Sequence, residues 1–230
     1  MTIKRVVATD FWYSPLVTNE LSRDEIFFML YLKTNPQTSQ LGIYKLPMQI
    51  METQVQMPAA EINALLNSLQ YNHDLIAYNR STNEIAILEY LSYSILTGGT
   101  PVERILKREI HHVESLELLT KVQAKMTDYW HRSERAIDGC LAELFAKEIA
   151  NRSRTEYADQ LLADLHDFWS DYFTADLIDE AYKRSKYKNA PDQYAKTILT
   201  DWQKRGVTSL KDVQLADYDH FNQQASILSN

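Results

Sequence analysis

The sequence predicts a mainly α-helical protein with a small β-hairpin, in which an N-terminal winged helix-turn-helix precedes an all-α C-terminal domain. Three observations support this fold class. Apolar residues recur every three or four positions over much of the chain, as in amphipathic helices. In residues 74–90, apolar and polar side chains alternate on both sides of the turn-forming sequence NRSTN, as in a β-hairpin. Gly98 and Gly99 then break the pattern.

The first predicted helix starts after Ser22, which has capping-box spacing with Glu25. Pro36 ends this helical region. The expected apolar stripe of the helix consists of Ile26, Phe27, Leu30 and Tyr31.

The next elements complete the order of a winged helix-turn-helix. Residues 41–47 form a short β-type run, residues 48–56 are compatible with a short helix, and residues 57–73 predict a clear amphipathic helix. This last helix is the expected recognition helix, and the hairpin at residues 74–90 is the expected wing.

The candidate DNA contacts of this region are Asn63 and Asn67 on the recognition helix and Arg80 in the wing. The recognition helix has no Lys or Arg, and residues 1–100 contain six basic against nine acidic residues. A module for self-association or protein contact is therefore an open alternative to a DNA reader.

The helical pattern continues from Pro101 to about Ala150. An interdomain helix, a coiled coil and two packed helices all fit this length. With the break at Gly98–Gly99, we expect a winged-helix domain at residues 1–100, a connecting helical region at 101–150 and a helical domain at 151–230.

The last third of the chain predicts four further helices and a loose C-terminal tail. One covers residues 154–173, one is capped by Thr174, and one begins at Pro191 and ends at Gly206. Thr208 or Ser209 can cap the last, short one. In the helix after Pro191, Tyr194, Ile198 and Trp202 are spaced at i, i+4 and i+8 and share one face.

Charge is unevenly distributed along this acidic chain, whose formal net charge is −7. Residues 136–182 hold three Lys/Arg against eleven Asp/Glu, whereas residues 183–211 hold eight Lys/Arg against two Asp. The basic segment can bind phosphates locally, because salt screens the acidic block beyond about 8 Å. Solvated helix faces are the plainer explanation of the same pattern.

No catalytic, metal-binding or cofactor-binding motif is recognisable. The chain has no phosphate-cradling glycine loop, its single cysteine is Cys140, and the adjacent His111 and His112 diverge on a helix. We therefore expect no enzyme activity, no metal and no cofactor. No apolar run approaches the roughly 20 residues of a membrane span, so we expect a cytoplasmic protein without a membrane partner.

Residues 177–213 resemble the C-terminal domain of DnaD-like replication proteins of Gram-positive bacteria and their phages. The resemblance includes the YxxxIxxxW pattern formed by Tyr194, Ile198 and Trp202, together with the segments ILTDW and GVTSLKDV. The first hundred residues are similar to the winged-helix part of phage replisome organisers, notably in TNPQTSQLGIYKLP.

The resemblance implies a replication-initiation adaptor that binds single- or double-stranded DNA, forms homo-oligomers, remodels DNA and helps to recruit the replicative helicase or its loader. Tyr187 would stack on an unpaired base. The candidate phosphate contacts are Lys183, Arg184, Lys186, Lys188, Lys196, Lys204 and Arg205.

Two other functions stay open at this point. A winged-helix transcriptional regulator would read an operator through Asn63, Asn67 and Arg80, but it does not account for the C-terminal motif. An assembly scaffold without DNA affinity would agree with the net charge. The Tyr–Ile–Trp stripe can also be ordinary core that holds the basic helix in position.

Overall fold

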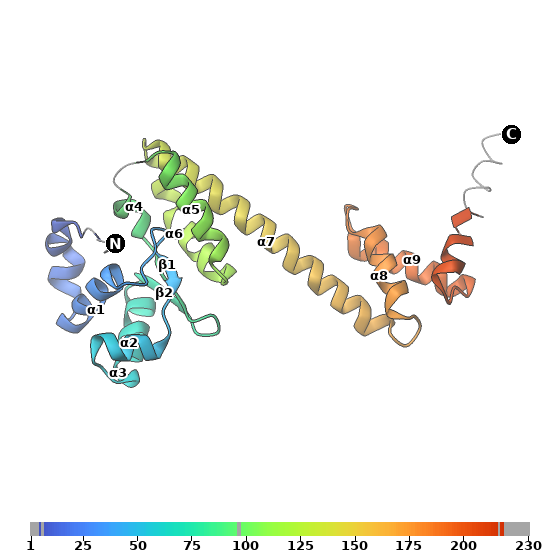
Figure 1. Cartoon of the computed structure of the whole chain (residues 1–230), viewed down its shortest axis with the longest axis horizontal. Helices are drawn as coiled ribbons and strands as arrows, with labels where there is room; N and C mark the ends of the chain where they lie inside the picture. Colours follow the sequence, from blue (N-terminus) through green and yellow to red (C-terminus); the bar gives the residue numbers. More distant parts are fainter. Residues whose placement is uncertain (1–4, 6, 96–97, 216, 219–230) are drawn as a thin grey trace. The chain divides into compact units, whose positions relative to one another are not determined.

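The computed structural model describes residues 5, 7–95, 98–215 and 217–218 (Figure 1). It is 70% helix with a three-stranded antiparallel sheet in the N-terminal part, which confirms the predicted fold class. The chain divides into two compact units, residues 1–152 and 153–230.

The N-terminal unit contains the predicted winged helix-turn-helix. Two short helical turns, Thr9–Tyr13 and Leu16–Glu20, precede the main elements. These are α1 (Arg23–Thr34), β1 (Ile43–Lys45), α2 (Met48–Val55), α3 (Ala59–Asn67), a further turn at Ser68–Asn72, β2 (Ile76–Asn79), β3 (Glu84–Ile87) and α4 (Tyr90–Ser94). The strand order is β1-β3-β2, so β1 adds a third strand to the predicted hairpin.

Helix α1 begins as the sequence predicts. The Ser22 hydroxyl accepts a hydrogen bond from the Glu25 backbone N–H at 3.3 Å. The Glu25 carboxylate accepts one from the Ser22 N–H at 2.7 Å, which completes the capping box.

The predicted apolar stripe of α1 is wrong in its phase. The buried apolar residues are Phe28, Met29 and Leu32, whereas Phe27 is 47% exposed. Ile26, Leu30 and Tyr31 are half-buried at the edges of this face. The run IFFMLYL is apolar almost all round, so periodicity alone does not select the face that meets α3 and the sheet.

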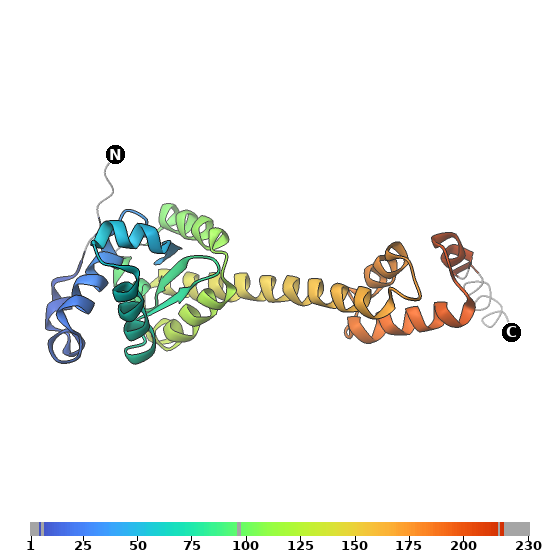
Figure 2. The same ribbon diagram turned by 90° about the horizontal axis from the view of Figure 1, so that it is seen from below.

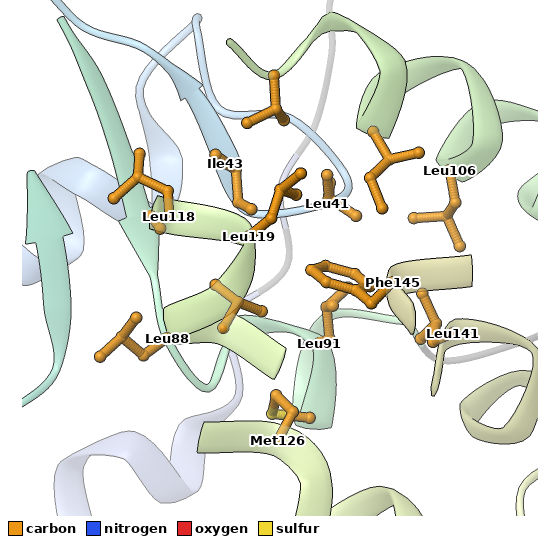
Figure 3. Close-up of a cluster of buried hydrophobic side chains, with 14 of the residues drawn as sticks. Leu41, Ile43, Leu88, Leu91, Leu106, Leu118, Leu119, Met126, Leu141 and Phe145 are labelled. Atoms are coloured by element: carbon orange, nitrogen blue, oxygen red, sulfur yellow. The ribbon is translucent and has the colours of Figure 1, made fainter. Parts of the chain in front are cut away.

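A second cluster of buried side chains joins the sheet to the helices that follow it. These are α5 (Thr100–His112), α6 (Leu116–Arg132) and the first turns of α7 (Ala136–Trp169). Figure 3 shows the Phe145 ring of α7 among leucines from other elements, including Leu41, Leu106 and Leu119. Residues 101–150 therefore help to build the core of the N-terminal unit.

A buried ion pair closes the turn between α6 and α7. The Arg135 guanidinium donates to both oxygens of Asp138 at 2.8 Å, and Asp138 is fully buried. The Ser133 hydroxyl donates to the same carboxylate at 2.5 Å. Arg135 also donates to the Ile95 and Leu91 carbonyls, at 3.0 and 3.3 Å, and so ties this turn to α4 and the residue after it.

Helix α7 is longer than the sequence suggests. Residues 154–169 of the helix predicted at 154–173 form the second half of α7, which runs for 34 residues without a break (Figure 2). The predicted end was wrong, because residues 170–173 lie in a turn after α7. Its first turns contribute Ile137, Leu141 and Phe145 to the N-terminal core. Its last turns contribute Leu161, Leu165 and Trp169 to the core of the C-terminal unit.

The C-terminal unit continues with α8 (Ala175–Ser185) and α9 (Pro191–Arg205). Gly206 ends α9 with a left-handed backbone (φ 70°), as the sequence predicts. Ser209 caps a last helical segment at residues 210–215 and accepts from the Asp212 N–H at 3.3 Å. Most of the predicted loose tail, residues 219–230, lies outside the described residues.

Candidate nucleic-acid interface

Helices α8 and α9 pack against each other and hold the basic segment (Figure 2). The face of α9 that enters the core consists of Ala195, Leu199 and Trp202. It meets Ile178 and Ala181 of α8, which are fully buried.

The predicted Tyr–Ile–Trp stripe passes from the core to the surface. Trp202 is 4% exposed, Ile198 is half-buried, and Tyr194 is 43% exposed. Four residues turn an α-helix about 40° beyond a full circle, so Tyr194 and Trp202 point about 80° apart. Trp202 therefore acts as a core residue, while Tyr194 presents its ring to solvent.

Two tyrosine rings lie beside lysines, one in the connection between α8 and α9 and one in the first turn of α9. Tyr187 is 86% exposed, and the Lys186 ammonium lies 4.8 Å from its ring centroid. The Lys188 ammonium lies 5.1 Å from the ring centroid of Tyr194. Lys183, in the last turn of α8, is also exposed. We call Lys183, Lys186, Tyr187, Lys188 and Tyr194 the cationic corner.

Arg184 has a structural position that the sequence did not predict. Its guanidinium donates to both oxygens of Asp217, each at 2.9 Å, and to Glu180 at 2.9 Å. The hydrogen bonds with Asp217 are the main reason that the pKa of Arg184 is raised. The guanidinium also lies 5.5 Å from the Trp202 ring centroid, so it braces α8 against α9 and the following segment.

The other candidate phosphate contacts lie away from the cationic corner. Lys204 and Arg205 are at the far end of α9, about 15 Å along the helix from Tyr194. Arg205 pairs with Asp201 at 2.9 Å. Lys196 lies in the wall of a groove lined by α7 and α9. The structure thus distributes the candidate phosphate contacts over four places: the cationic corner, the contact of Arg184 with Trp202, the groove wall and the far end of α9.

The N-terminal candidates are also separated. The Asn63 amide donates to the Ala59 carbonyl of its own helix at 2.8 Å, and this side chain is half-buried. Asn67 is exposed on α3, and Arg80 is exposed at the tip of the wing. The other exposed residues of α3 are Ala60, Glu61 and Ala64, which offer DNA no cation.

A groove between α7 and α9, with a volume of about 900 Å³, was not predicted from the sequence. Exposed aromatic residues line it, including Phe168 and Tyr172. The segment DFWSDYF carries the signal for it, since four aromatic residues in seven positions exceed what one buried helix face accommodates.

In the part of the chain that the structure describes, no group of three or more His, Cys, Asp or Glu side chains is arranged to hold a metal ion. None of the described helices combines the length and the apolar character needed to cross a bilayer.

The C-terminal part of the chain matches a known family. Residues 143–217 match the model of a family described as "replication initiation and membrane attachment". The matched range covers most of α7, all of α8 and α9, and the segment that includes Asp217. No curated protein and no solved structure matches the chain.

Proposed function

Since residues 143–217 form a DnaD-like domain of the replication-initiation family, we propose that the protein is a DNA-binding adaptor in replication initiation. The DnaD-like family consists of non-catalytic replication adaptors. The cationic corner of this domain is the surface that binds DNA in this role.

The juxtaposition of exposed rings and ammonium groups at the corner supports this assignment. The lysines beside Tyr187 and Tyr194 can neutralise phosphates, which anchors a strand without reading its sequence. An exposed tyrosine ring can stack on a base, a contact worth about 1–3 kcal/mol.

The corner fits single-stranded DNA better than duplex. Stacking requires an unpaired base, and the Tyr187 ring is almost entirely open to solvent. The exposed face of α3 offers Asn67 without a neighbouring cation, so we place duplex reading by the winged helix second. This ranking favours replication over operator recognition.

The partners follow from the family and are part of the proposal. They are the replicative helicase or its loader and further copies of the same chain. The family description includes membrane attachment, whereas our expectation of no membrane partner stays a prediction.

Replacing Lys183, Lys186 and Lys188 together with alanine tests the corner. We expect weaker binding to a single-stranded oligonucleotide and a salt dependence, as log K against log salt, that is shallower by roughly 2. Each lost phosphate contact removes about 0.7 from that slope. Fluorescence anisotropy of the full chain at several salt concentrations measures both effects.

A triple alanine variant at Lys107, Lys121 and Lys147 is the matched control, because it changes the net charge equally in the N-terminal unit. Its slope should stay at the wild-type value. An unchanged slope in the corner variant would remove these lysines from the interface. If the wild-type protein showed no salt-dependent binding to any DNA, the result would favour an assembly scaffold without DNA affinity.

A further inference from the structure

The groove between α7 and α9 differs in chemistry from the cationic corner. Its exposed aromatic residues are Tyr157, Phe168 and Tyr172. Phe168 is 69% exposed, although a phenylalanine ring gains about 1.5–3 kcal/mol when it is buried. The groove therefore presents an apolar strip that a partner can cover with a gain in free energy.

Carboxylates surround this strip. Asp164 and Asp167 line the groove from α7, and Asp192 lines it from α9. Lys196 is the one cation among the described lining residues. Three carboxylates against one ammonium repel a phosphate backbone and favour a partner with basic side chains.

The dimensions of the groove fit a helix. The lining residues of α7 from Tyr157 to Trp169 recur at steps of one to three, and they span about 18 Å of helix. The lining residues of α9 from Asp192 to Gln203 span about 16 Å. Two helical walls of about three turns each can accommodate a third helix lying along them.

We propose that the groove docks an amphipathic helix of a partner protein. The helix has about three turns, carries apolar anchors at i, i+3 or i+4, and i+7, and is flanked by Lys or Arg. Its apolar side chains cover Phe168 and Tyr172, and its basic side chains face Asp164, Asp167 and Asp192. The groove shares no lining residue with the cationic corner and has the opposite charge.

The test uses the full chain and two fluorescent peptides of about 14 residues. Both carry the same Leu and Phe anchors at helical spacing, one with flanking lysines and one with flanking glutamates. We expect saturable binding of the lysine peptide and binding at least tenfold weaker for the glutamate peptide. Phe168→Ala and the double change D164N with D167N should each weaken the lysine peptide about tenfold.

Two matched variants isolate the groove. Asp159→Asn removes a carboxylate from an exposed position of α7 that is not among the lining residues, and should leave peptide binding unchanged. Tyr187→Ala should weaken binding to single-stranded DNA but leave peptide binding unchanged. This pair separates a failure of the groove from a failure of the proposed DNA surface.

Several results would overturn the proposal. Equal binding of both peptides, or full binding by the D164N and D167N double variant, would show that charge does not select the occupant. Self-association in sedimentation velocity that Phe168→Ala abolishes would assign the groove to a second copy. Loss of DNA binding in Phe168→Ala would assign it to nucleic acid.

Discussion

Replacing Trp202 with alanine is expected to unfold the C-terminal unit. Trp202 is 4% exposed and packs with the fully buried Ile178, Ala181 and Leu199. Truncating a buried tryptophan costs about 3–5 kcal/mol, through lost burial and the cavity that remains. The change also removes the ring beneath the Arg184 guanidinium, which couples α8 to α9.

Hydrogen–deuterium exchange on the full chain measures this effect unit by unit. Amides of α8 and α9 should lose protection in Trp202→Ala, whereas those of the N-terminal unit should keep it. Tyr194→Ala is the control on the same helix, and its exposed ring predicts little loss of protection. A Trp202→Ala protein with native protection but no DNA binding would contradict the assignment of Trp202 to the core.

Replacing Asp138 with alanine is expected to destabilise the N-terminal unit by about 3 kcal/mol. Asp138 is fully buried and accepts hydrogen bonds from Arg135 and Ser133. Removing one partner of a buried pair leaves the other partner's charge uncompensated. The partial exposure of Arg135 places the expected cost at the lower end of the range for such pairs.

Urea denaturation monitored by circular dichroism measures the loss of stability. Hydrogen–deuterium exchange of the amides in α6 and the first turns of α7 locates it. Glu134→Ala is the matched control, because it removes an exposed carboxylate from the same turn. Equal urea midpoints of unfolding for Asp138→Ala and wild type would show that the ion pair of Arg135 and Asp138 does not stabilise the turn.

The elements that local chemistry specifies could be predicted from sequence. Ser22 with Glu25 specified the start of α1, NRSTN specified the turn of the wing, and Gly206 specified the end of α9. In each case the deciding interaction lies within a few residues, so the sequence contains both partners side by side.

The features that depend on distant partners could not be predicted in this way. The phase of α1 depends on which face meets the core, because Phe27 and Phe28 are equally apolar. The role of Arg184 depends on Asp217, 33 residues away. The sequence around Arg152 does not indicate that α7 continues there, because polar residues are common both in exposed helical turns and in loops.

The sequence named the residues of the proposed site, but it could not indicate their arrangement. The basic segment contained the lysines of the cationic corner, yet sequence proximity also grouped them with Lys196, Lys204 and Arg205. Helix geometry separates these residues along α9, and it brings Tyr194 beside Lys188 across a loop.

Hydrogen–deuterium exchange on the full chain, with and without a single-stranded oligonucleotide, can locate the DNA-binding surface. If the cationic corner of the C-terminal unit binds single-stranded DNA, peptides that cover residues 183–194 gain protection, while α3 and the tip of the wing do not change. Protection confined to α3 and residues 80–83, with none at residues 183–194, would instead assign DNA binding to the winged helix.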